Sequence, residues 1–312
     1  MGELPLISVI IPSYYSPDLF ATLKSVVNQD YPHIQPVVVD DGTRGFDPLE
    51  VRNWLSAQTR GNLEQIQVLQ NPENRGTVFT MNRALKLCQG EYIFNLACDD
   101  EFYDEKVLSD WVAEFQKTGA QVMTAYRAVY DEKLEHCRGV EPQPQQVRDL
   151  EQKSPSELFE DLAKANYVFG SCTARTAESF RKYGAYDEGY RLIEDHPAIL
   201  SLLRQGEPVR FFHRTVVKCR TGGTSSAENY NEAYANDVDR ILTHEVLPHT
   251  DHPRAMKWAY YQWKREQRIL KKRADLLKKH GKSRINRAII ALWYYGHHPV
   301  SVLCKLPKKI LP

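Results

Sequence analysis

Several absences limit what this chain of 312 residues can be. No stretch approaches the ~20 apolar residues that a helix needs to span a bilayer, and the N-terminus carries no secretory signal peptide. The six cysteines are scattered and form no C-x-x-C pair. This argues against a zinc site and for free thiols in a reducing cytosol. We therefore expect a cytoplasmic protein without a transmembrane helix.

Two glycine-rich phosphate-binding motifs are also missing. No G-x-G-x-x-G follows the first predicted strand, and G-x-x-x-x-G-K-[ST] occurs nowhere. Dinucleotide-binding and P-loop interpretations are therefore weak. The length allows a sizeable core in one large domain or two small ones.

Charge is unevenly divided along the chain, although the formal net charge is only +1. Residues 252–312 hold 16 Lys and Arg against 2 Asp and Glu, whereas residues 1–251 hold 25 against 38. A mildly acidic body thus carries a strongly basic tail. Such a tail usually contacts an anionic surface, either a membrane or a nucleic acid.

Strands and helices alternate in the first part of the chain. Apolar, β-branched runs predict strands, and apolar residues at helical spacing predict amphipathic helices between them. The predicted strands are residues 7–12, 37–39, 66–69 and 92–96, and the helices start near Ser16-Pro17, Asp47, Thr77 and Asp104. This order predicts an α/β fold, an open and mostly parallel sheet flanked by helices in a Rossmann-like arrangement.

The pattern changes after Gln121. A strand is predicted over residues 122–130, and a polar stretch over 134–153 predicts a long mobile loop of the kind that often forms a lid. Ser154-Pro155-Ser156-Glu157 is a capping box that opens a helix to about residue 164. A further helix over 176–183 and two short strands over 209–212 and 215–219 complete this half.

Polar side chains follow four of the predicted strands. Because the carboxyl ends of parallel strands share one edge of a sheet, these loops predict a ligand site at that edge. The residues are Pro12, Ser13 and Tyr14, then Asp40 and Asp41, then Asn74, Arg75 and Gly76, and finally Asp99 and Asp100.

Asp99 and Asp100 are the candidate metal ligands among these residues. Carboxylate oxygens are hard ligands that suit Mg²⁺ or Mn²⁺, and such an ion can neutralise a diphosphate leaving group. The alternative is a solvated acidic turn in which Asp104 caps the next helix. These residues alone leave both interpretations open.

Glu194, Asp195 and Arg220 are candidates from the second half of the chain. Two carboxylates at a helix start complement the helix dipole, and they can equally supply a general base at the edge of a cleft. Arg220 begins a loop rich in Gly, Ser and Thr, from which its side chain could reach a phosphate. A solvated loop is the equal alternative there.

With these motifs, the chain resembles the family 2 glycosyltransferases, which have the nucleotide-diphospho-sugar transferase (GT-A) fold. Five pieces occur in the family's order and at its usual spacings over roughly residues 5–225. They are Ile7 to Ser13, Val38 to Thr43, Asn74 to Gly76, Gly90 to Ile93 with Asp99-Asp100, and Glu194-Asp195.

The resemblance implies a role for each piece. The loop from Pro12 to Tyr14 and the pair Asp40-Asp41 correspond to the uracil and ribose contacts. Asn74, Arg75 and Gly76 lie where the family contacts the base or the phosphates, and Asp99 with Asp100 corresponds to the metal-binding D-x-D site. Asp195 matches the catalytic base of an inverting displacement, with Glu194 supporting it.

One position departs from the family pattern. Ala97 replaces the first Asp of the common Asp-x-Asp-Asp, and no His ligand follows in the Arg220 loop, so the third ligand of Mn²⁺ or Mg²⁺ is unassigned. The implied activity is transfer of a sugar from a nucleotide-diphospho-sugar, UDP-linked in most of the family, to a hydroxyl of a glycan or lipid-linked acceptor. Such a reaction belongs to synthesis of a bacterial surface polysaccharide.

The resemblance also divides the chain. We expect a catalytic domain over residues 1–235, with a nucleotide-sugar half over 1–118 and an acceptor half over 119–235. A basic helical region over 236–312 follows, which contains a long amphipathic helix over 253–280 and a short apolar aromatic run over 288–295.

The basic region has two interpretations, which the sequence leaves open. Peripheral attachment to the anionic cytoplasmic face of the inner membrane would place the enzyme beside a lipid-linked acceptor. Alternatively, the apolar stripe packs on the catalytic domain or on a second protomer, which would make a homo-oligomer.

Two other functions compete with sugar transfer. A nucleotidyltransferase of related fold would want a Gly-rich, Lys- and Arg-bearing first loop, which Ser13-Tyr14-Tyr15 does not provide. A non-catalytic protein with a basic tail for nucleic acid is opposed by the acidic body and by the lack of any nucleic-acid-binding motif. We therefore expect no nucleic-acid partner.

Overall fold

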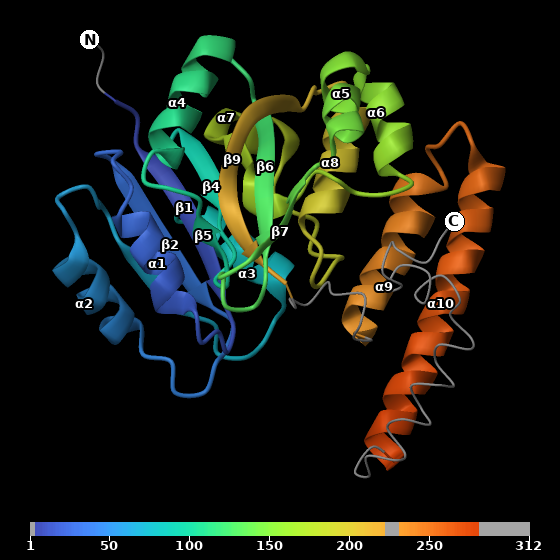
Figure 1. Cartoon of the computed structure of the whole chain (residues 1–312), viewed down its shortest axis with the longest axis horizontal. Coiled ribbons are helices and arrows are strands. Elements are labelled where there is room, and N and C mark those ends of the chain that lie inside the picture. The colour runs from blue at the N-terminus through green and yellow to red at the C-terminus, as the bar shows by residue number, and fades with distance from the viewer. Residues whose placement is uncertain (1–3, 222–230, 281–312) are drawn as a thin grey trace.

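A computed structural model describes residues 4–221 and 231–280 of the chain. Its centre is a nine-stranded sheet in the order β3-β2-β1-β4-β8-β6-β9-β5, with β7 paired to β6 (Figure 1). The strands are β1 (Ile7–Ser13), β2 (Ile34–Asp40), β3 (Gln67–Gln70), β4 (Tyr92–Asn95), β5 (Glu101–Phe102), β6 (Val122–Tyr130), β7 (Cys137–Glu141), β8 (Thr173–Thr176) and β9 (Arg210–Arg220).

The sheet has a parallel half and a mixed half. Strand β1 lies between β2 and β4, and β2 pairs with β3, all in parallel. Beyond β4 the sheet is mixed. Strand β8 is antiparallel to both β4 and β6, and β5 is antiparallel to β9, whereas β6 and β9 are parallel. The strand–helix alternation in the sequence predicts the parallel half, and the mixed half follows the point where that alternation stops.

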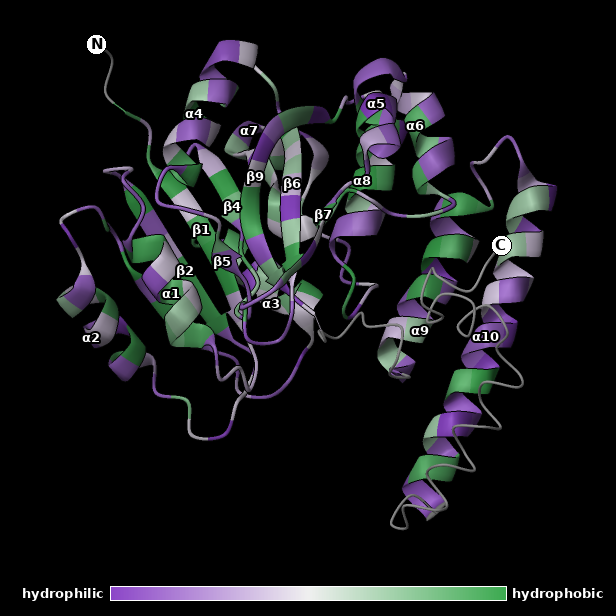
Figure 2. Ribbon diagram, viewed as in Figure 1, coloured by the Kyte–Doolittle hydropathy of each residue, from purple (hydrophilic) through white to green (hydrophobic). Residues whose placement is uncertain are grey.

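Helices cover both faces of the sheet. They are α1 (Leu19–Val27), α2 (Pro48–Gln58), α3 (Thr77–Leu85), α4 (Val107–Thr118), α5 (Pro144–Gln152), α6 (Pro155–Leu162), α7 (Ala177–Tyr183), α8 (Asp195–Arg204), α9 (Glu232–Arg240) and α10 (Pro253–His280), with short helical segments η1 (Gly170–Cys172) and η2 (Ile241–Val246). Successive β1 residues enter opposite cores: Val9 packs with residues of α1, α2 and α4, and Ile10 with residues of α3, α6 and α8. Figure 2 shows the resulting apolar strands at the centre.

Three sequence expectations are wrong in detail. The predicted mobile loop over 134–153 contains β7 and α5. Strand β7 pairs with β6, and α5 buries Val147 and Leu150. The predicted strands over 209–212 and 215–219 form one strand, β9, whose pairing with β6 shifts register near Tyr126. The capping box at Ser154 is confirmed.

The third error concerns the start of α1. The helix begins at Leu19 with Asp18 at its N-cap position, not at Ser16. The hydroxyl of Ser16 instead donates to the Cys98 carbonyl at 2.8 Å, and it accepts the Asp18 N–H at 3.3 Å. Ser16 therefore ties the loop after β1 to the loop after β4.

The C-terminal region is helical as predicted, with α10 running 28 residues along one side of the molecule (Figure 1). Among the described residues, no helix has the length and apolar character needed to cross a membrane. The apolar run over 288–295 lies outside the described residues. The predicted domain boundary at residue 235 falls within α9 and stays a prediction.

Candidate active site

Two neighbouring cavities open at the carboxyl edge of the parallel strands. The first measures about 690 Å³ and the second about 700 Å³. They meet at residues that line both cavities, which are Thr77, Ala97, Asp99, Leu192, Arg220 and Thr221. The loop after β4 and the end of β9 thus stand between the two cavities.

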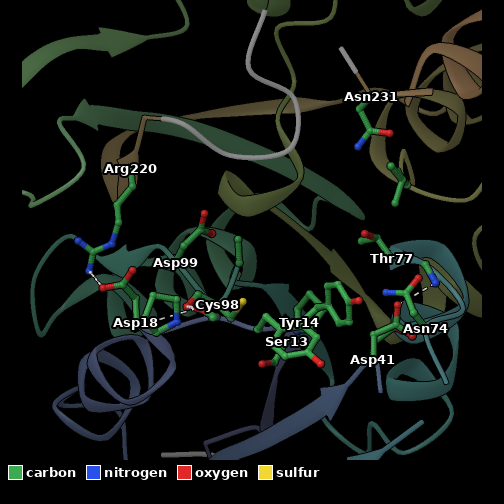
Figure 3. A pocket seen from close by; sticks show the side chains of 18 of the residues that line it. Ser13, Tyr14, Asp18, Asp41, Asn74, Thr77, Cys98, Asp99, Arg220 and Asn231 are labelled. Carbon is green, nitrogen blue, oxygen red and sulfur yellow. Dashed lines mark hydrogen bonds and ion pairs between the residues drawn. The ribbon is translucent and has the colours of Figure 1, made fainter. Parts of the chain in front are cut away.

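The first cavity collects most of the predicted nucleotide-binding residues. Its lining includes Pro12, Ser13, Tyr14, Asp41, Asn74, Gly76 and Asp99. Figure 3 shows Asp41 and Asn74 at one end, Asp99 and Arg220 at the other, and Tyr14 between them. The Tyr14 side chain is 49% exposed, so its ring is open to a ligand.

Asp41 organises the turn that leads into α3. Its Oδ1 accepts the Arg75 N–H at 2.8 Å, and its Oδ2 accepts the Gly76 N–H at 2.8 Å. Gly76 has a φ of 93°, and a Cβ there would lie 2.4 Å from the Arg191 carbonyl oxygen. Only glycine accommodates that close approach, which brings residue 191 against the turn.

Two predicted nucleotide-binding residues lie outside the lining of the first cavity. Asp40 is fully buried, and its Oδ2 accepts the Thr43 N–H at 2.7 Å and a Gln70 amide N–H at 3.0 Å. Arg75 is exposed, with its guanidinium 4.3 Å from the centre of the Phe79 ring. In this structure Asp40 closes the turn after β2. Nucleotide contact by Asp40 or Arg75 stays a prediction.

Asp99, Asp100 and Arg220 meet where the two cavities join. The Arg220 N–H donates to Asp100 Oδ1 at 3.1 Å, and its guanidinium lies 3.0 Å from Glu101 and 3.4 Å from Asp18. The two Asp residues therefore lie beside a cation that other carboxylates already bind. Asp18 and Glu101 are parts of this cluster that the sequence motifs did not indicate.

Burial raises the pKa values of the neighbouring carboxylates Asp99 and Asp100. It raises the pKa of Asp99, and together with the charge of Asp99 it raises the pKa of Asp100 to about 7. The negative charges of adjacent carboxylates disfavour double ionisation unless a cation balances them. Carboxylate oxygens are ligands that suit Mg²⁺ or Mn²⁺, and metal binding by Asp99 and Asp100 stays a prediction.

The second cavity contains Glu194 and Asp195 together with Asp99 and Asp100. Asp195 begins α8, and its Oδ2 accepts the Gly170 N–H at 2.9 Å while its Oδ1 accepts the His196 N–H at 2.7 Å. The structure thus brings Asp195, the predicted base, to the same cavity as Asp99 and Asp100, which follow β4.

The neighbours of Asp195 differ in character. Burial and the charge of Asp195 raise the pKa of Glu194 well above its ordinary value. Burial lowers the pKa of His196, whose Nε2 donates to the Leu162 carbonyl at 2.9 Å. His196 therefore joins α8 to α6. Asp195, in contrast, lines the cavity and is held there by two backbone N–H groups.

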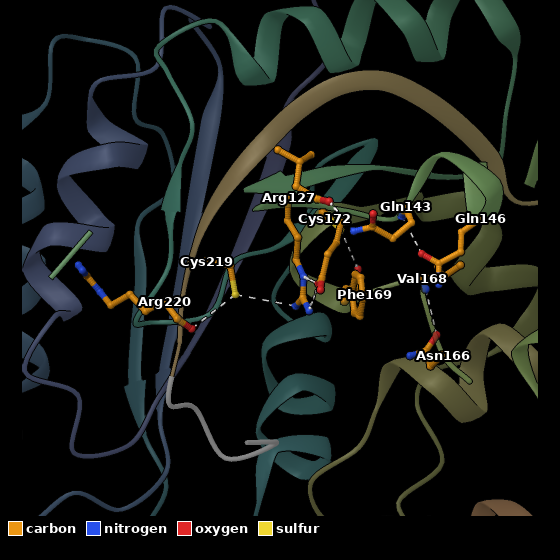
Figure 4. A network of polar contacts seen from close by, with 12 residues as sticks. Arg127, Gln143, Gln146, Asn166, Val168, Phe169, Cys172, Cys219 and Arg220 are labelled. Carbon is orange, nitrogen blue, oxygen red and sulfur yellow. Dashed lines mark hydrogen bonds and ion pairs between the residues drawn. The ribbon is translucent and has the colours of Figure 1, made fainter. Parts of the chain in front are cut away.

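Arg127 forms one wall of the second cavity. Its guanidinium donates to Glu141 Oε2 at 2.8 and 3.1 Å and lies 3.4 Å from the centre of the Phe169 ring (Figure 4). A stacked, doubly hydrogen-bonded guanidinium keeps one orientation. Arg127 comes from β6 and Glu141 from β7, inside the segment predicted as a loop.

The segment before Glu194 is held by a buried carboxylate of α9. Asp237, which is 5% exposed, accepts N–H bonds from Arg191, Leu192 and Ile193 at 2.6 to 3.0 Å. The Arg191 guanidinium in turn donates to Asn74 Oδ1 at 2.5 Å. Sequence reasoning missed Asp237, because its partners are backbone groups that no side-chain pattern marks.

Comparison with known proteins identifies the family. The family model described as "Glycosyl transferase family 2" matches residues 8–184, more than half of the chain. The chain belongs to glycosyl transferase family 2. This membership makes the nucleotidyltransferase and nucleic-acid-binding alternatives unnecessary.

Two relatives carry names that refer to polysaccharide synthesis. The chain is 33% identical over 127 residues to TuaG of Bacillus subtilis (strain 168), which is named as a glycosyltransferase of teichuronic acid biosynthesis. The match covers 39% of this chain and 47% of TuaG. It is 32% identical over 118 residues to WcaA of Escherichia coli (strain K12), assigned to colanic acid biosynthesis, which covers 38% and 40% of the two chains. The matches thus span less than half of each relative.

Solved structures agree on the fold. TarS of S. aureus, solved as residues 1–349 with UDP-GlcNAc, matches 84% of this chain and 72% of its own with a TM-score of 0.57 and 17% identity. The mannosyltransferase PcManGT from Pyrobaculum calidifontis, solved with GDP-Man and Mn²⁺, matches 98% and 89% with a TM-score of 0.53 and 17% identity. The family 2 chain therefore has the predicted GT-A-type fold with a C-terminal helical extension.

Proposed function

We propose that this family 2 protein is an inverting glycosyltransferase. It moves a sugar from a nucleotide-diphospho-sugar to a hydroxyl of a glycan or lipid-linked acceptor in surface polysaccharide synthesis. The observation that carries the proposal is that Asp99 and Asp100, from the first half of the chain, line one cavity together with Asp195, from the second. The assigned roles of TuaG and WcaA support the polysaccharide pathway.

The first cavity is the proposed donor site. Asp41 and Asn74 at its far end would receive the nucleoside, with the Tyr14 ring beside it, and the diphosphate would lie at Asp99 (Figure 3). Arg220 at that end could pair with phosphate oxygens once its bonds to Glu101 loosen. UDP is the proposed nucleotide because the family mostly uses it, and TarS was solved with UDP-GlcNAc.

The second cavity is the proposed acceptor site. Asp195 removes the proton of the acceptor hydroxyl while that oxygen attacks the anomeric carbon, and the nucleoside diphosphate leaves with the bonding electrons from the opposite face. The Gly170 and His196 N–H groups hold the Asp195 carboxylate in position. The raised pKa of Glu194 favours its protonated form, which would donate a hydrogen bond beside Asp195.

Asp99 and Asp100 fit a divalent ion, Mn²⁺ or Mg²⁺. Among the described residues, no group of three His, Cys, Asp or Glu side chains forms a complete metal site. Mg²⁺ in particular often takes only one or two protein carboxylates and completes its shell with substrate phosphates and water. When bound, the ion would neutralise charge on the departing diphosphate. Arg220 holds Asp100 in place through its backbone N–H.

Asp195→Asn tests the proposal. We expect sugar transfer to be lost, because the amide cannot accept the proton, while UDP still binds in the presence of Mn²⁺. Glu178→Gln makes a comparable carboxylate-to-amide change at an exposed position on α7 and should leave turnover unchanged. Near-normal transfer by Asp195→Asn would refute the base assignment. The cytoplasmic location and a homo-oligomer through the C-terminal helices stay predictions.

A further inference from the structure

The outward face of α10 combines cations with large exposed aromatic rings. Positions three, four and seven apart share one face of a helix, and such a series runs along this side of α10. Trp258 and Tyr261 are 66% and 67% exposed there. The exposed cations beside them are Arg254, Lys257, Arg265 and Arg268.

Other sides of α10 contact the protein. Met256 and Leu270 are 1% and 8% exposed. The Tyr260 hydroxyl donates to Asp239 Oδ1 of α9 at 2.5 Å, and Lys264 pairs with the same oxygen at 2.8 Å. Part of the apolar stripe, including Leu270, is therefore buried, whereas its Trp258 and Tyr261 are exposed. Helix α10 runs along one side of the molecule (Figure 1).

We propose that the outward face of α10 docks on an anionic lipid bilayer. Cations attract the negative surface of such a membrane, and Trp and Tyr side chains favour the boundary between headgroups and acyl chains. The acidic balance of residues 1–251 would turn the rest of the molecule away from the same surface. Docking would thus orient the protein as well as attach it.

Two other occupants fit this face less well. A symmetric pair of chains joined through it would set the four cations against four identical ones. A nucleic acid would be attracted to the outward face of α10 but repelled by the acidic body beside it. A bilayer needs only one straight line of contact, which a helix of 28 residues provides.

The position of α9 connects this surface to the second cavity. Tyr234 and Val238 of α9 line that cavity, while Asp239 of the same helix holds α10. Helix α9 thus links α10 to the second cavity, and the proposed membrane face lies on a different side of α10.

Vesicle flotation of the full chain tests the docking surface. We compare vesicles of phosphatidylcholine alone with vesicles that also contain phosphatidylglycerol, at low and high salt. The first variant is Arg265→Gln with Arg268→Gln. The matched control is Arg52→Gln with Lys86→Gln, which removes two exposed cations from the body. The full chain keeps residues 281–312 the same in every sample.

We expect salt-sensitive binding to the anionic vesicles only. Each surface cation contributes about fivefold to membrane partitioning, so the α10 double variant should bind about 25-fold more weakly and the control unchanged. Trp258→Ser with Tyr261→Ser should weaken binding further. Equal binding by the α10 variant and the control would overturn the proposal, as would binding that ignores lipid charge.

Two parallel measurements identify a different occupant. Light scattering that finds a dimer lost in the α10 variant would assign the face to a second copy and overturn membrane docking. Tight binding of a single-stranded oligonucleotide, without vesicle binding, would also overturn it. UDP binding by calorimetry in the same variants tests the proposed function separately, because vesicle binding does not depend on the donor site.

Discussion

Removing the Asp237 carboxylate should impair catalysis although Asp237 is not among the residues that line the two cavities. Its oxygens accept three consecutive N–H groups from the segment that leads into Glu194 and Asp195. In Asp237→Asn, the amide oxygen can still accept backbone N–H bonds from this segment. The amide nitrogen, however, is a donor and would face a backbone N–H that is also a donor. The segment would then shift, and Asp195 would shift with it.

The expected size of this effect follows from the contacts. Hydrogen bonds to a charged group contribute about 1.5–3 kcal/mol each, and a buried donor left unpaired costs about 1–3 kcal/mol. An amide oxygen at the Oδ2 position keeps the bonds from Leu192 and Ile193, while the amide nitrogen at the Oδ1 position opposes the Arg191 N–H, so we expect a loss of about 1–3 kcal/mol in the free energy of unfolding. A displacement of about 1 Å at a reacting group lowers rates roughly 100-fold, so kcat should fall on the order of 10- to 100-fold.

Initial rates of nucleotide release, measured well below the melting temperature, separate positioning from unfolding. We expect kcat to fall much more than the KM for the donor changes, and Asp237→Glu to restore part of the loss. Asp239→Asn is the matched control, because that carboxylate contacts Tyr260 and Lys264 rather than the segment over 191–193. Wild-type kcat and stability in Asp237→Asn would show that the segment is positioned without it.

Three further predictions concern the site itself. Gly170→Ala would place a Cβ 2.9 Å from Glu194 Oε1 and 3.3 Å from Asp195 Cβ. Sugar transfer should therefore drop about tenfold or more, while circular dichroism shows an intact fold. Full activity would contradict the tight contact. Asp99→Asn with Asp100→Asn should abolish the Mn²⁺ dependence of UDP binding in calorimetry, and wild-type UDP binding that ignores EDTA would count against a metal here. The pKa of Glu194 is raised to about 8 in the folded protein from an ordinary value of about 4.5, so the folded state binds more protons between these values and stability should fall as pH rises from 5 towards 8. Glu194→Gln should flatten this decline in melting temperature, and an unchanged slope would refute the raised pKa.

The parallel half of the fold is legible in the sequence because its signals are local. The apolar run from Ile7 to Pro12 can only be stable buried on both faces, which makes β1 a central strand. Polar residues directly after such strands must meet at one edge, so the lining by Tyr14, Asp41 and Asp99 was predictable. The same holds for Asp195, whose position at a helix start follows from the chain around it.

Other features left no local signal. Strand β7 is largely exposed, so it lacks the alternation of apolar and polar residues that marks a half-buried strand, and its polar segment was predicted as a loop. Asp40 and Asp41 are adjacent and chemically identical, yet only Asp41 lines the first cavity. Their different burial depends on the turns that each carboxylate closes.

The sequence by itself determined the strand–helix alternation, the edge of the sheet that carries the candidate site, the candidate carboxylates and the basic character of the last helix. Periodicity and charge determine these, and both are properties of neighbouring residues. Only the tertiary structure decided that Asp195 lines a cavity with Asp99 and Asp100, that Asp237 holds the segment before it, and which face of α10 remains outward. These depend on contacts between residues far apart in the chain and on the water that packing excludes.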